Sequence, residues 1–392
     1  MRLALDLAAK GLGQTRPNPA VGAVLVKNGA VVGRGYHRTA GLPHAEAVAL
    51  RRAGSAARGA TLYVNLEPCC HRGRTPPCVD RIKCAGVRRV VVALKDPNPL
   101  VAGRGIRRLR AAGVQVDVGL LAHEATHVNE PFLTFHRLGR PFFVAKWALT
   151  LDGRFAAVSG DSRWITGGQS RAYVHEIRAR YDAVMVGIGT VLADDPRLNV
   201  RLSGRRKVIQ PSRIIVDSRL RTPLKARCLD PTDAGPTILV ATDAAPKRRV
   251  EQFLRRGATV LTVPGEKGIV DLTALADRLH GLGIQSVLIE GGRQVLSSLF
   301  AADLVDRVVA FFAPKIVGGE EGQHVLAGWG VRTMKQAIPL QEVAIRHFGT
   351  DVCVEGYVHH GIGRASASGK RVRVSRKRTA GGARSQNWKE SC

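Results

Sequence analysis

Four residues near the start of the chain have the types and the spacing of a catalytic metal centre. His44 and Glu46 are separated by one residue, Cys69 follows Pro68, and Cys78 comes later. One imidazole and two thiolates can hold Zn²⁺ and leave its fourth position for water, whose pKa the metal lowers. Glu46 would not bind the metal and can move protons between water and a reacting molecule. We therefore predict a hydrolytic zinc site with His44, Cys69 and Cys78 as ligands and Glu46 as the acid–base group.

The predicted secondary structure explains how these side chains reach one place. His44 directly precedes a predicted helix at 45–53, so its side chain and that of Glu46 can converge beyond the helix N-terminus. Cys69 follows a predicted strand at 61–66. The partial positive charge of a helix N-terminus favours thiolate over thiol, which suits a metal ligand.

Two other interpretations of these residues stay open. A His-x-Glu pair alone is typical of an ordinary solvated helix start. Four cysteines could instead form an all-thiolate structural zinc site, although their spacing does not match the short pairs of zinc ribbons. Those cysteines are Cys69, Cys70, Cys78 and Cys84.

The length and composition predict two folded domains and a basic tail. At 392 residues the chain is too long for one ordinary core, and its formal net charge is +29. Residues 359–392 have almost no apolar side chains, which predicts disorder. A strongly basic surface attracts phosphates, on nucleic acid and on small substrates alike. No apolar run is long enough to span a membrane and no signal peptide is recognisable, so we expect a cytoplasmic protein.

Strand and helix patterns alternate along both parts of the chain, which is typical of layered α/β domains. The pattern loosens at 131–141, so we place the domain boundary near residue 140. The expected strands are 21–26, 31–36, 61–66, 89–94, 114–118, 142–147, 183–186, 213–217, 237–241, 286–290, 307–312 and 352–358. The expected helices are 45–53, 79–85, 106–112, 170–181, 247–256 and 271–282.

The loop between the two predicted zinc thiolates narrows the family. The order His-x-Glu, Pro-Cys, Cys is the signature of zinc deaminases, but cytidine and tRNA deaminases have Pro-Cys-x-x-Cys, whereas eight residues separate Cys69 from Cys78 here. The loop at 68–78, Pro-Cys-Cys-His-Arg-Gly-Arg-Thr-Pro-Pro-Cys, resembles that of the bifunctional deaminase/reductase family of riboflavin biosynthesis. Further matches are Pro17-Asn18-Pro19, Gly33-x-Gly35-Tyr36-His37 and Asp96-Pro97-Asn98-Pro99. One departure is Cys70, where that family often has Ser.

Residues 142–358 resemble the reductase half of the same family. The likeness rests on the stretches 146–153, 162–166 and 190–198 and on Glu290-Gly291-Gly292. The last of these has a mechanism of its own, because a strand, two glycines and a helix N-terminus present free N–H groups to an anion; an ordinary loop is the alternative. No Gly-x-Gly-x-x-Gly motif follows the first strand, so we do not expect a Rossmann site.

The resemblance implies an α/β protein with a cytidine-deaminase-like three-layer domain at 1–140, a dihydrofolate-reductase-like domain at 141–358 and the tail at 359–392. It implies zinc-dependent hydrolytic deamination of 2,5-diamino-6-ribosylamino-4-pyrimidinone 5′-phosphate, then NADPH-dependent reduction of the ribosyl to a ribityl side chain. The implied cofactors are Zn²⁺ and NADPH, and the implied substrate is a phosphorylated pyrimidine. Relatives form homo-oligomers, so the resemblance implies one here.

The resemblance also assigns residues to the two sites. Lys146 would be the catalytic residue that polarises the ribose carbonyl during hydride transfer; the alternative is that Lys146 and Glu290 are plain surface or ion-pair residues. The deaminase substrate would contact Asn18, His71, Arg74 and Thr75, with Arg74 near its phosphate. The reductase substrate would contact Ser162, Arg178, Leu198, Arg201 and Glu290. NADPH would contact Ala148, Trp164, Thr190, Asp194, Ser218, Gly292, Arg293, Gln294, Val295, Leu296, Ser297 and Ser298.

Two other functions compete with this one. A nucleic-acid-acting zinc deaminase would use the tail at 359–392 to bind RNA or DNA, and a non-enzymatic RNA-binding protein would keep only the scaffold. The long gap between Cys69 and Cys78 argues against the first, and the complete ligand set with Glu46 argues against the second. For the tail itself, a solvated extension and non-specific nucleic-acid contact are the alternatives.

Overall fold

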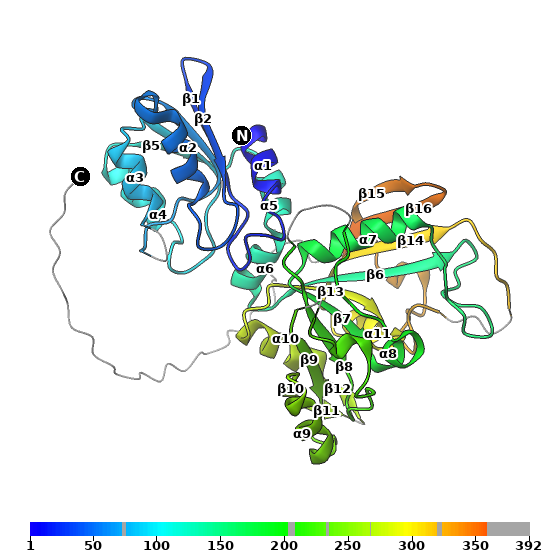
Figure 1. Ribbon diagram of the computed structural model, residues 1–392. Helices are drawn as coiled ribbons and strands as arrows, with labels where there is room; N and C mark the ends of the chain where they lie inside the picture. The colour runs from blue at the N-terminus through cyan, green and yellow to red at the C-terminus, as the bar shows by residue number, and fades with distance from the viewer. Residues whose placement is uncertain (73–75, 203–207, 233–234, 267, 320–323, 359–392) are drawn as a thin grey trace.

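The computed structural model contains a large mixed sheet in each half of the chain (Figure 1). It describes residues 1–72, 76–202, 208–232, 235–266, 268–319 and 324–358. Helices flank both sheets, so the predicted α/β class is confirmed. No helix within these ranges is long and apolar enough to cross a membrane.

The first sheet is built from β1 (Gly22–Lys27), β2 (Ala30–Tyr36), β3 (Thr61–Leu66), β4 (Arg89–Leu94) and β5 (Gln115–Val118). Its strand order is β2-β1-β3-β4-β5, and β1 pairs antiparallel with both neighbours while β3, β4 and β5 are parallel. The turn at Asn28-Gly29 joins β1 and β2 with both residues at positive φ, 49° and 79°. Asn and Gly tolerate this conformation, which explains the tight hairpin.

Helices cover both faces of this sheet and form the predicted three layers. They are α1 (Arg2–Ala9), α2 (Ala45–Ala53), α3 (Cys78–Cys84), α4 (Arg104–Ala111), α5 (Ala122–Val128) and α6 (Glu130–Leu138). Successive strand residues point to opposite faces. Ala23 and Leu25 therefore pack in one cluster with α2, α3 and α4, whereas Val24 packs with α1.

The segment at 131–141, which we expected to be loose, is mostly helical. Pro131 lies in the first turn of α6, where its missing N–H costs no helical hydrogen bond. Phe132 and Leu133 then bury the helix against the sheet. The expectation was wrong because a proline at a helix start was taken for a break. The boundary near residue 140 stays a prediction.

The second sheet contains β6 (Phe142–Thr150), β7 (Ala183–Gly187), β8 (Ser212–Val216), β9 (Thr237–Ala241), β10 (Thr259–Thr262), β13 (Ser286–Gly291), β14 (Val305–Ala313), β15 (Gln341–Phe348) and β16 (Asp351–Tyr357). Its order is β10-β9-β8-β7-β13-β6-β14-β16-β15. The strands from β10 to β14 are parallel, and β16 and β15 complete the edge in antiparallel pairing. Every strand expected in this half is present, whereas β10 and β15 were not predicted.

Helices also flank the second sheet. They are α7 (Gly168–Arg180), α8 (Ile188–Asp194), α9 (Lys247–Arg255), α10 (Leu272–Gly281) and α11 (Arg293–Ala301), and a small hairpin joins β11 (Gly265–Glu266) to β12 (Ile269–Val270). Phe143 lies in the core cluster of α10 and α11, and its neighbour Phe142 lies in the cluster of α7. The central strand β6 is thus buried on both faces, as its continuous apolar sequence predicts.

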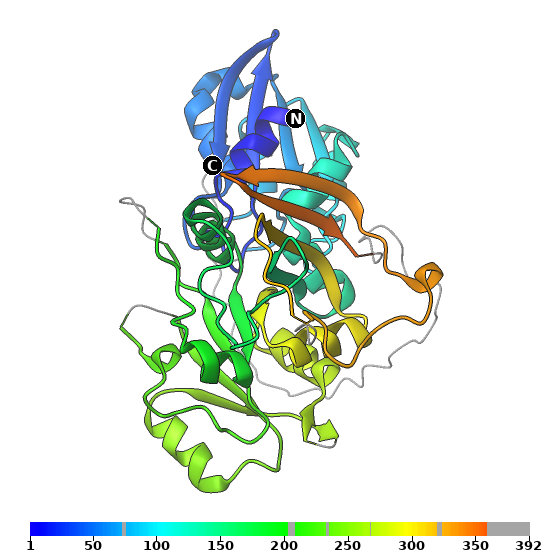
Figure 2. The same ribbon diagram turned by 90° about the vertical axis from the view of Figure 1, so that its right-hand side faces the viewer.

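The two halves touch through Arg16 and Gln285. The Arg16 guanidinium donates a hydrogen bond to the carbonyl of Tyr181, and its Nε lies 3.4 Å from Asp182 Oδ1. Gln285 Nε2 donates to the carbonyl of Pro17 at 2.8 Å. The hairpin of β15 and β16 lies beside the first half of the chain (Figure 2).

Candidate active sites

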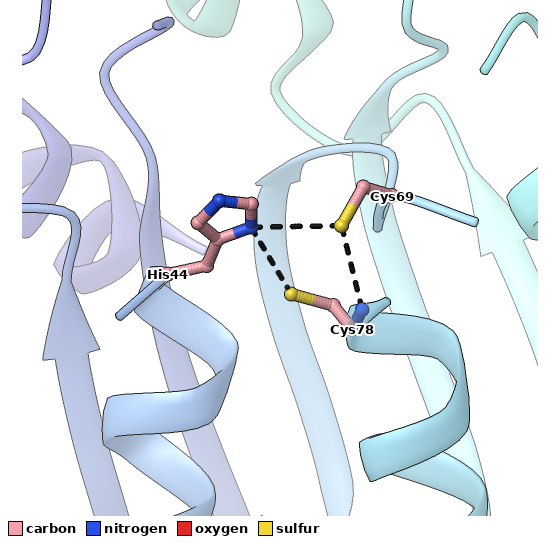
Figure 3. Close-up of side chains that lie close together, drawn as sticks. All are labelled: His44, Cys69 and Cys78. Atoms are coloured by element: carbon pink, nitrogen blue, oxygen red, sulfur yellow. Dashed lines mark hydrogen bonds between the residues drawn. The ribbon is translucent and has the colours of Figure 1, made fainter. Parts of the chain in front are cut away.

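His44, Cys69 and Cys78 converge at one end of the first sheet (Figure 3). His44 is the N-cap of α2, Cys69 follows β3, and Cys78 is the first residue of α3. His44 Nδ1 lies 3.5 Å from Cys69 Sγ and 3.3 Å from Cys78 Sγ. One ring nitrogen and two sulfurs therefore face one point, with Nδ1 as the nitrogen offered to a metal.

The two cysteines form a pair that favours negative charge on one sulfur. The hydrogen bond with Cys78 is the main reason that the pKa of Cys69 falls to about 4, and His44 also lowers it. The pKa of Cys78 is raised in turn. The backbone N–H of Cys78 donates to Cys69 Sγ at 3.4 Å. Two cysteine sulfurs, one of them favoured as a thiolate, beside an imidazole are a donor set that suits Zn²⁺, so these residues fit the metal.

Glu46 lies in the first turn of α2 and is 3% exposed. Burial raises the pKa of its carboxyl to about 7, and the negative charge of Cys69 contributes to the rise. A group that gains and loses its proton near neutral pH is suited to acid–base catalysis. The arrangement can therefore hydrolyse a bond with a metal-activated water.

The all-thiolate alternative does not match the geometry. Among the described residues, the possible metal ligands that gather here are His44, Cys69 and Cys78. Cys84 is exposed, and the thiol of Cys70 points to the carbonyl of Leu100 at 3.8 Å.

Two glycines of β2 let α2 lie close enough to the sheet to place His44. A Cβ on Gly33 would lie 2.4 Å from the carbonyl oxygen of Ala49, and one on Gly35 would lie 2.6 Å from that of Ala45. Any side chain at either position would push the helix away. The Gly33-x-Gly35 motif, noted in the sequence through resemblance, thus has a packing reason.

Glu67 anchors the loop that carries Cys69. Its buried carboxylate accepts hydrogen bonds from N–H groups at the start of α4, among them that of Ile106 at 3.1 Å. Gly105 allows this approach, because a Cβ there would lie 2.2 Å from the carbonyl oxygen of Pro68. No role was predicted for Glu67 from the sequence, where its position before the Pro-Cys pair was the only signal.

The predicted contacts with the deaminase substrate are partly in place. Asn18 Nδ2 lies 3.0 Å from His37 Nε2, and the His37 ring packs edge-on against His44 with 5.2 Å between centroids. His71 Nδ1 is buried and has no hydrogen-bond partner in the described part of the chain. His37, noted in the sequence only as part of a motif, thus links Asn18 to the metal-binding imidazole. Two predicted contacts lie outside the described residues: Arg74 and Thr75.

A second site lies in the other half of the chain, where a cavity of about 1270 Å³ opens at the carboxyl ends of β6, β7, β8 and β13. Parallel α/β sheets bind ligands at this edge. Gly291, Gly292 and the N-terminus of α11 line the cavity, so the predicted strand–Gly–Gly–helix faces it. Gly292 has φ +90°, and a Cβ there would lie 2.9 Å from the backbone nitrogen of Gly187. Glycine is therefore required where the two strand ends meet.

Most residues predicted to contact NADPH line this cavity. They are Ala148, Thr190, Asp194, Ser218, Gly292, Arg293, Gln294, Val295, Leu296 and Ser298. Ser297 is buried outside the lining, and the exposed Trp164 packs under Arg171, whose guanidinium carbon lies 4.5 Å from the ring centroid. Arg219 and Arg221 also line the cavity and were not predicted. Their place just after a strand was the only signal.

Lys146, Ser162 and Glu290 line the same cavity. Lys146 and Glu290 come from paired parallel strands, since Ala145 and Ile289 are register partners. Burial lowers the pKa of Lys146, although the charge of Glu290 opposes the shift. The cavity thus presents a lysine amine beside a carboxylate.

The carboxylate of Glu290 is paired with Arg178. Arg178 grips it with two nitrogens, Nη2 at 2.7 Å from Oε2 and Nε on Oε1. Burial alone would raise the pKa of Glu290, but Arg178 and Lys146 lower it to about 2. Glu290 is therefore an ion-pair residue with Arg178 as its partner, and it also faces the cavity. Three predicted substrate contacts are not among the described residues that line the cavity: Arg178, Leu198 and Arg201.

Comparison with protein-family models matches both halves of the chain. Residues 141–354 match the RibD C-terminal domain, and residues 1–94 match the cytidine and deoxycytidylate deaminase zinc-binding region.

Curated proteins and solved structures give the same result over nearly the whole chain. The riboflavin biosynthesis protein RibD of Aquifex aeolicus is 45% identical over 90% of this chain and 96% of its own length. A structure of Acinetobacter baumannii RibD covers 91% of this chain and 97% of its own at 38% identity, with a TM-score of 0.83. A diaminohydroxyphosphoribosylaminopyrimidine deaminase/5-amino-6-(5-phosphoribosylamino)uracil reductase from Thermotoga maritima gives 36% identity and a TM-score of 0.77 over 91% of this chain and 97% of its own.

Proposed function

Because this chain belongs to the RibD family, and is a zinc deaminase joined to an NADPH-dependent reductase of riboflavin biosynthesis, we propose which of its residues carry each reaction. The substrate we propose is the phosphorylated diaminopyrimidinone of that pathway. It is deaminated first, and its ribosyl group is then reduced. Asn18 and His71 bind the pyrimidine in the deaminase site, and the unpartnered Nδ1 of His71 supports that contact.

In the deaminase site we assign the metal ligands to His44, Cys69 and Cys78. Zn²⁺ supplies a Lewis acid there and lowers the pKa of water. Glu46 takes a proton from the attacking water and gives it to the ring nitrogen. It then carries a second proton, from the hydroxyl group added to the ring carbon, to the amine, which leaves as ammonia while the carbonyl forms. The burial of Glu46 and the pKa of about 7 of its carboxyl support this role.

In the reductase site we assign Lys146 to the ribose carbonyl. NADPH supplies the hydride, and the Lys146 ammonium donates a hydrogen bond that stabilises charge developing on the carbonyl oxygen. Glu290, fixed by Arg178, raises the pKa of Lys146 against the larger effect of burial and so favours its ammonium form. The N-terminus of α11 faces the pyrophosphate, and Arg219 and Arg221 contact the 2′-phosphate that distinguishes NADPH from NADH.

The convergence of His44, Cys69 and Cys78 beside the buried Glu46 carries the proposal for the first site. Assays of ammonia release and NADPH oxidation test both sites. Glu46→Gln should lower ammonia release by about 10²–10⁴-fold and leave reduction of already deaminated substrate unchanged. Lys146→Ala should lower NADPH oxidation and leave ammonia release unchanged. Glu176→Gln, at an exposed residue of α7, is the matched control.

Two outcomes would contradict these assignments. One is ammonia release at the wild-type rate in Glu46→Gln with zinc still bound. The other is NADPH oxidation at the wild-type rate in Lys146→Ala.

We also propose a homo-oligomer in the cytoplasm, from the family resemblance. The tail at 359–392, outside the described residues, is basic enough for non-specific contact with nucleic acid. Removal of the tail should leave both activities intact, and light scattering of the intact chain would measure its oligomeric state.

A further inference from the structure

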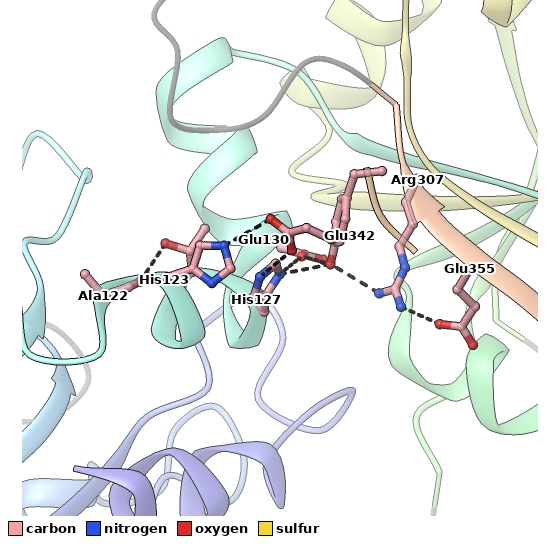
Figure 4. A network of polar contacts seen from close by, with 9 residues as sticks. Ala122, His123, His127, Glu130, Arg307, Glu342 and Glu355 are labelled. Atoms are coloured by element: carbon pink, nitrogen blue, oxygen red, sulfur yellow. Dashed lines mark hydrogen bonds and ion pairs between the residues drawn. The ribbon is translucent and has the colours of Figure 1, made fainter. Parts of the chain in front are cut away.

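We propose that His123, His127 and Glu342 form a second site for a transition-metal ion, Zn²⁺ above all, which joins α5 to β15 (Figure 4). The nitrogen and oxygen atoms that these side chains offer lie within 4.8 Å of one another. The two histidines belong to the first half of the chain and the glutamate to the second. A metal here would fasten one half to the other.

The helix α5 places both imidazoles on one face. His123 and His127 are four positions apart, and their ring centroids lie 4.6 Å from each other. The stretch His-Glu-Ala-Thr-His has the spacing by which helical histidine pairs bind zinc in metalloproteases. Of this stretch, only the two histidines belong to the proposed site. Glu124 between them is exposed and is not one of the grouped ligands.

Glu342 supplies the carboxylate from the other half of the chain. Its Oε1 lies 3.0 Å from His123 Nε2, and its Oε2 lies 3.0 Å from His127 Nε2. Glu342 has φ 50°, at a register shift between Gln341 and Ala344 in the pairing of β15 with β16. This bulge redirects the side chain, which reaches α5. Two imidazoles and a carboxylate are a common zinc ligand set that leaves positions for water.

A second carboxylate fixes the orientation of one ligand. His127 Nδ1 lies 2.8 Å from Glu130 Oε1 and 3.0 Å from the hydroxyl of Tyr357. Glu130 is buried and is balanced by Arg307, whose Nη1 lies 3.9 Å from Glu130 Oε2. Metal-binding histidines commonly donate their other ring N–H to such a carboxylate. The Nδ1 atom of His127 thereby keeps its proton. The Nε2 atom, which faces Glu342, is the one that can bind the ion.

An ion-pair network alone does not explain the whole cluster. It accounts for the buried Glu130 and its contact with Arg307, but the side chains of His123 and Glu342 are 70% and 47% exposed. Exposed ion pairs stabilise a protein little, so three such groups need another reason to converge on one point. Their exposure also gives an ion a path into the site.

Titration with Co²⁺ of the full chain carrying one equivalent of zinc, in the site of His44, Cys69 and Cys78, tests this site. The wild type should bind one more metal equivalent per chain than His123→Ala or Glu342→Gln. That equivalent should show ligand-field absorption without thiolate-to-metal charge transfer, because its ligands contain no sulfur. Exchange into the site of His44 and Cys69 would give charge transfer and is thereby recognised. His347→Ala, at an exposed histidine of β15 outside the group, should bind as much metal as the wild type.

A thermal measurement separates this site from the deaminase site. In a Cys69→Ser background, added Zn²⁺ should still raise the melting temperature, because an ion that binds only the native state stabilises it. Addition of His123→Ala should abolish that rise. The proposal is overturned if His123→Ala and Glu342→Gln bind as much metal as the wild type. It is also overturned if they lower the melting temperature equally with and without Zn²⁺, which would make the cluster an ion pair between the halves only.

Discussion

Glu46 and Lys146 are ionisable groups whose pKa values burial shifts in the direction that favours the uncharged form. Burial raises the pKa of Glu46 to about 7 and lowers that of Lys146. Their neighbours then act differently, because Cys69 adds to the rise at Glu46 whereas Glu290 opposes the fall at Lys146. Glu46 is thus suited to exchange protons, and Glu290 favours the charged form of Lys146 that its proposed role needs.

Arg219 tests the assignment of the 2′-phosphate contact. Arg219→Ala should raise the KM for NADPH by about 10-fold or more, because a hydrogen bond to a charged group contributes about 1.5–3 kcal/mol. The KM for NADH should hardly change, since NADH has no 2′-phosphate. Steady-state kinetics with both cofactors check this, with the exposed Arg248→Ala of α9 as control. An equal rise for the two cofactors would refute the contact.

His175 on α7 should make the protein less stable in mild acid. Burial is the main reason that its pKa falls from 6.5 to about 4, and the charges of Arg178 and Arg201 add to it. Between these values the unfolded chain binds more protons than the native one, so stability falls as the pH drops from 6.5 to about 4. The melting temperature of His175→Gln should therefore decrease less steeply across this window. Parallel curves for variant and wild type would contradict the prediction.

The zinc residues could be predicted because their types and order lie in one short, specific motif. Arg219, Arg221 and Glu67 could not, since a single arginine or glutamate beside a strand is common. Their roles depend on a cavity and a buried turn that exist only once distant strand ends meet. Ser297 is a residue for which the resemblance predicted too much. It was expected to contact NADPH with its neighbours, but α11 turns its side chain away from the cavity.

At the scale of elements, glycines at close contacts decide how precisely the zinc loop is held. Gly105→Ala should loosen that loop, because its Cβ would lie 2.2 Å from the carbonyl of Pro68, a backbone atom that cannot move freely. Overpacking of this kind costs about 1–3 kcal/mol. Zinc content and ammonia release should fall while reduction of deaminated substrate continues.

Gly281→Ala is the matched control, since a Cβ on this helical glycine meets nothing within 4 Å. Full zinc content in Gly105→Ala would show that α4 can shift without moving Cys69.

Strands such as β9, and the helix α2, were predicted to the residue because their apolar patterns are strong. The strand β15 was missed because its residues are almost all exposed, so no apolar alternation marks it.

At the scale of the whole molecule, Arg16 links the two halves outside the α5–β15 cluster. It contacts Tyr181, Asp182 and Ile209, the last at 3.0 Å. Arg16→Ala would leave Asp182, whose side chain is 15% exposed, without its cation, and removal of one partner of a largely buried pair destabilises the protein. Calorimetry should show a lower melting temperature and two separated transitions, with both activities retained below the first.

Arg2→Ala, at an exposed residue of α1, should leave the single transition unchanged. An unaltered melting temperature in Arg16→Ala would mean that other contacts hold the halves together. This link could not be read from the sequence, because Arg16 is one of 60 lysines and arginines and no local pattern distinguishes it.

The pairing of β6 also has a consequence for how the chain folds during synthesis. The strands of the first sheet follow one another closely in sequence, so that sheet can form soon after β5 leaves the ribosome. The strand β6 must wait, because its partners β13 and β14 are made much later. Nascent chains will thus carry an unpaired apolar strand behind a finished first half, and this interval is when chaperones are most needed.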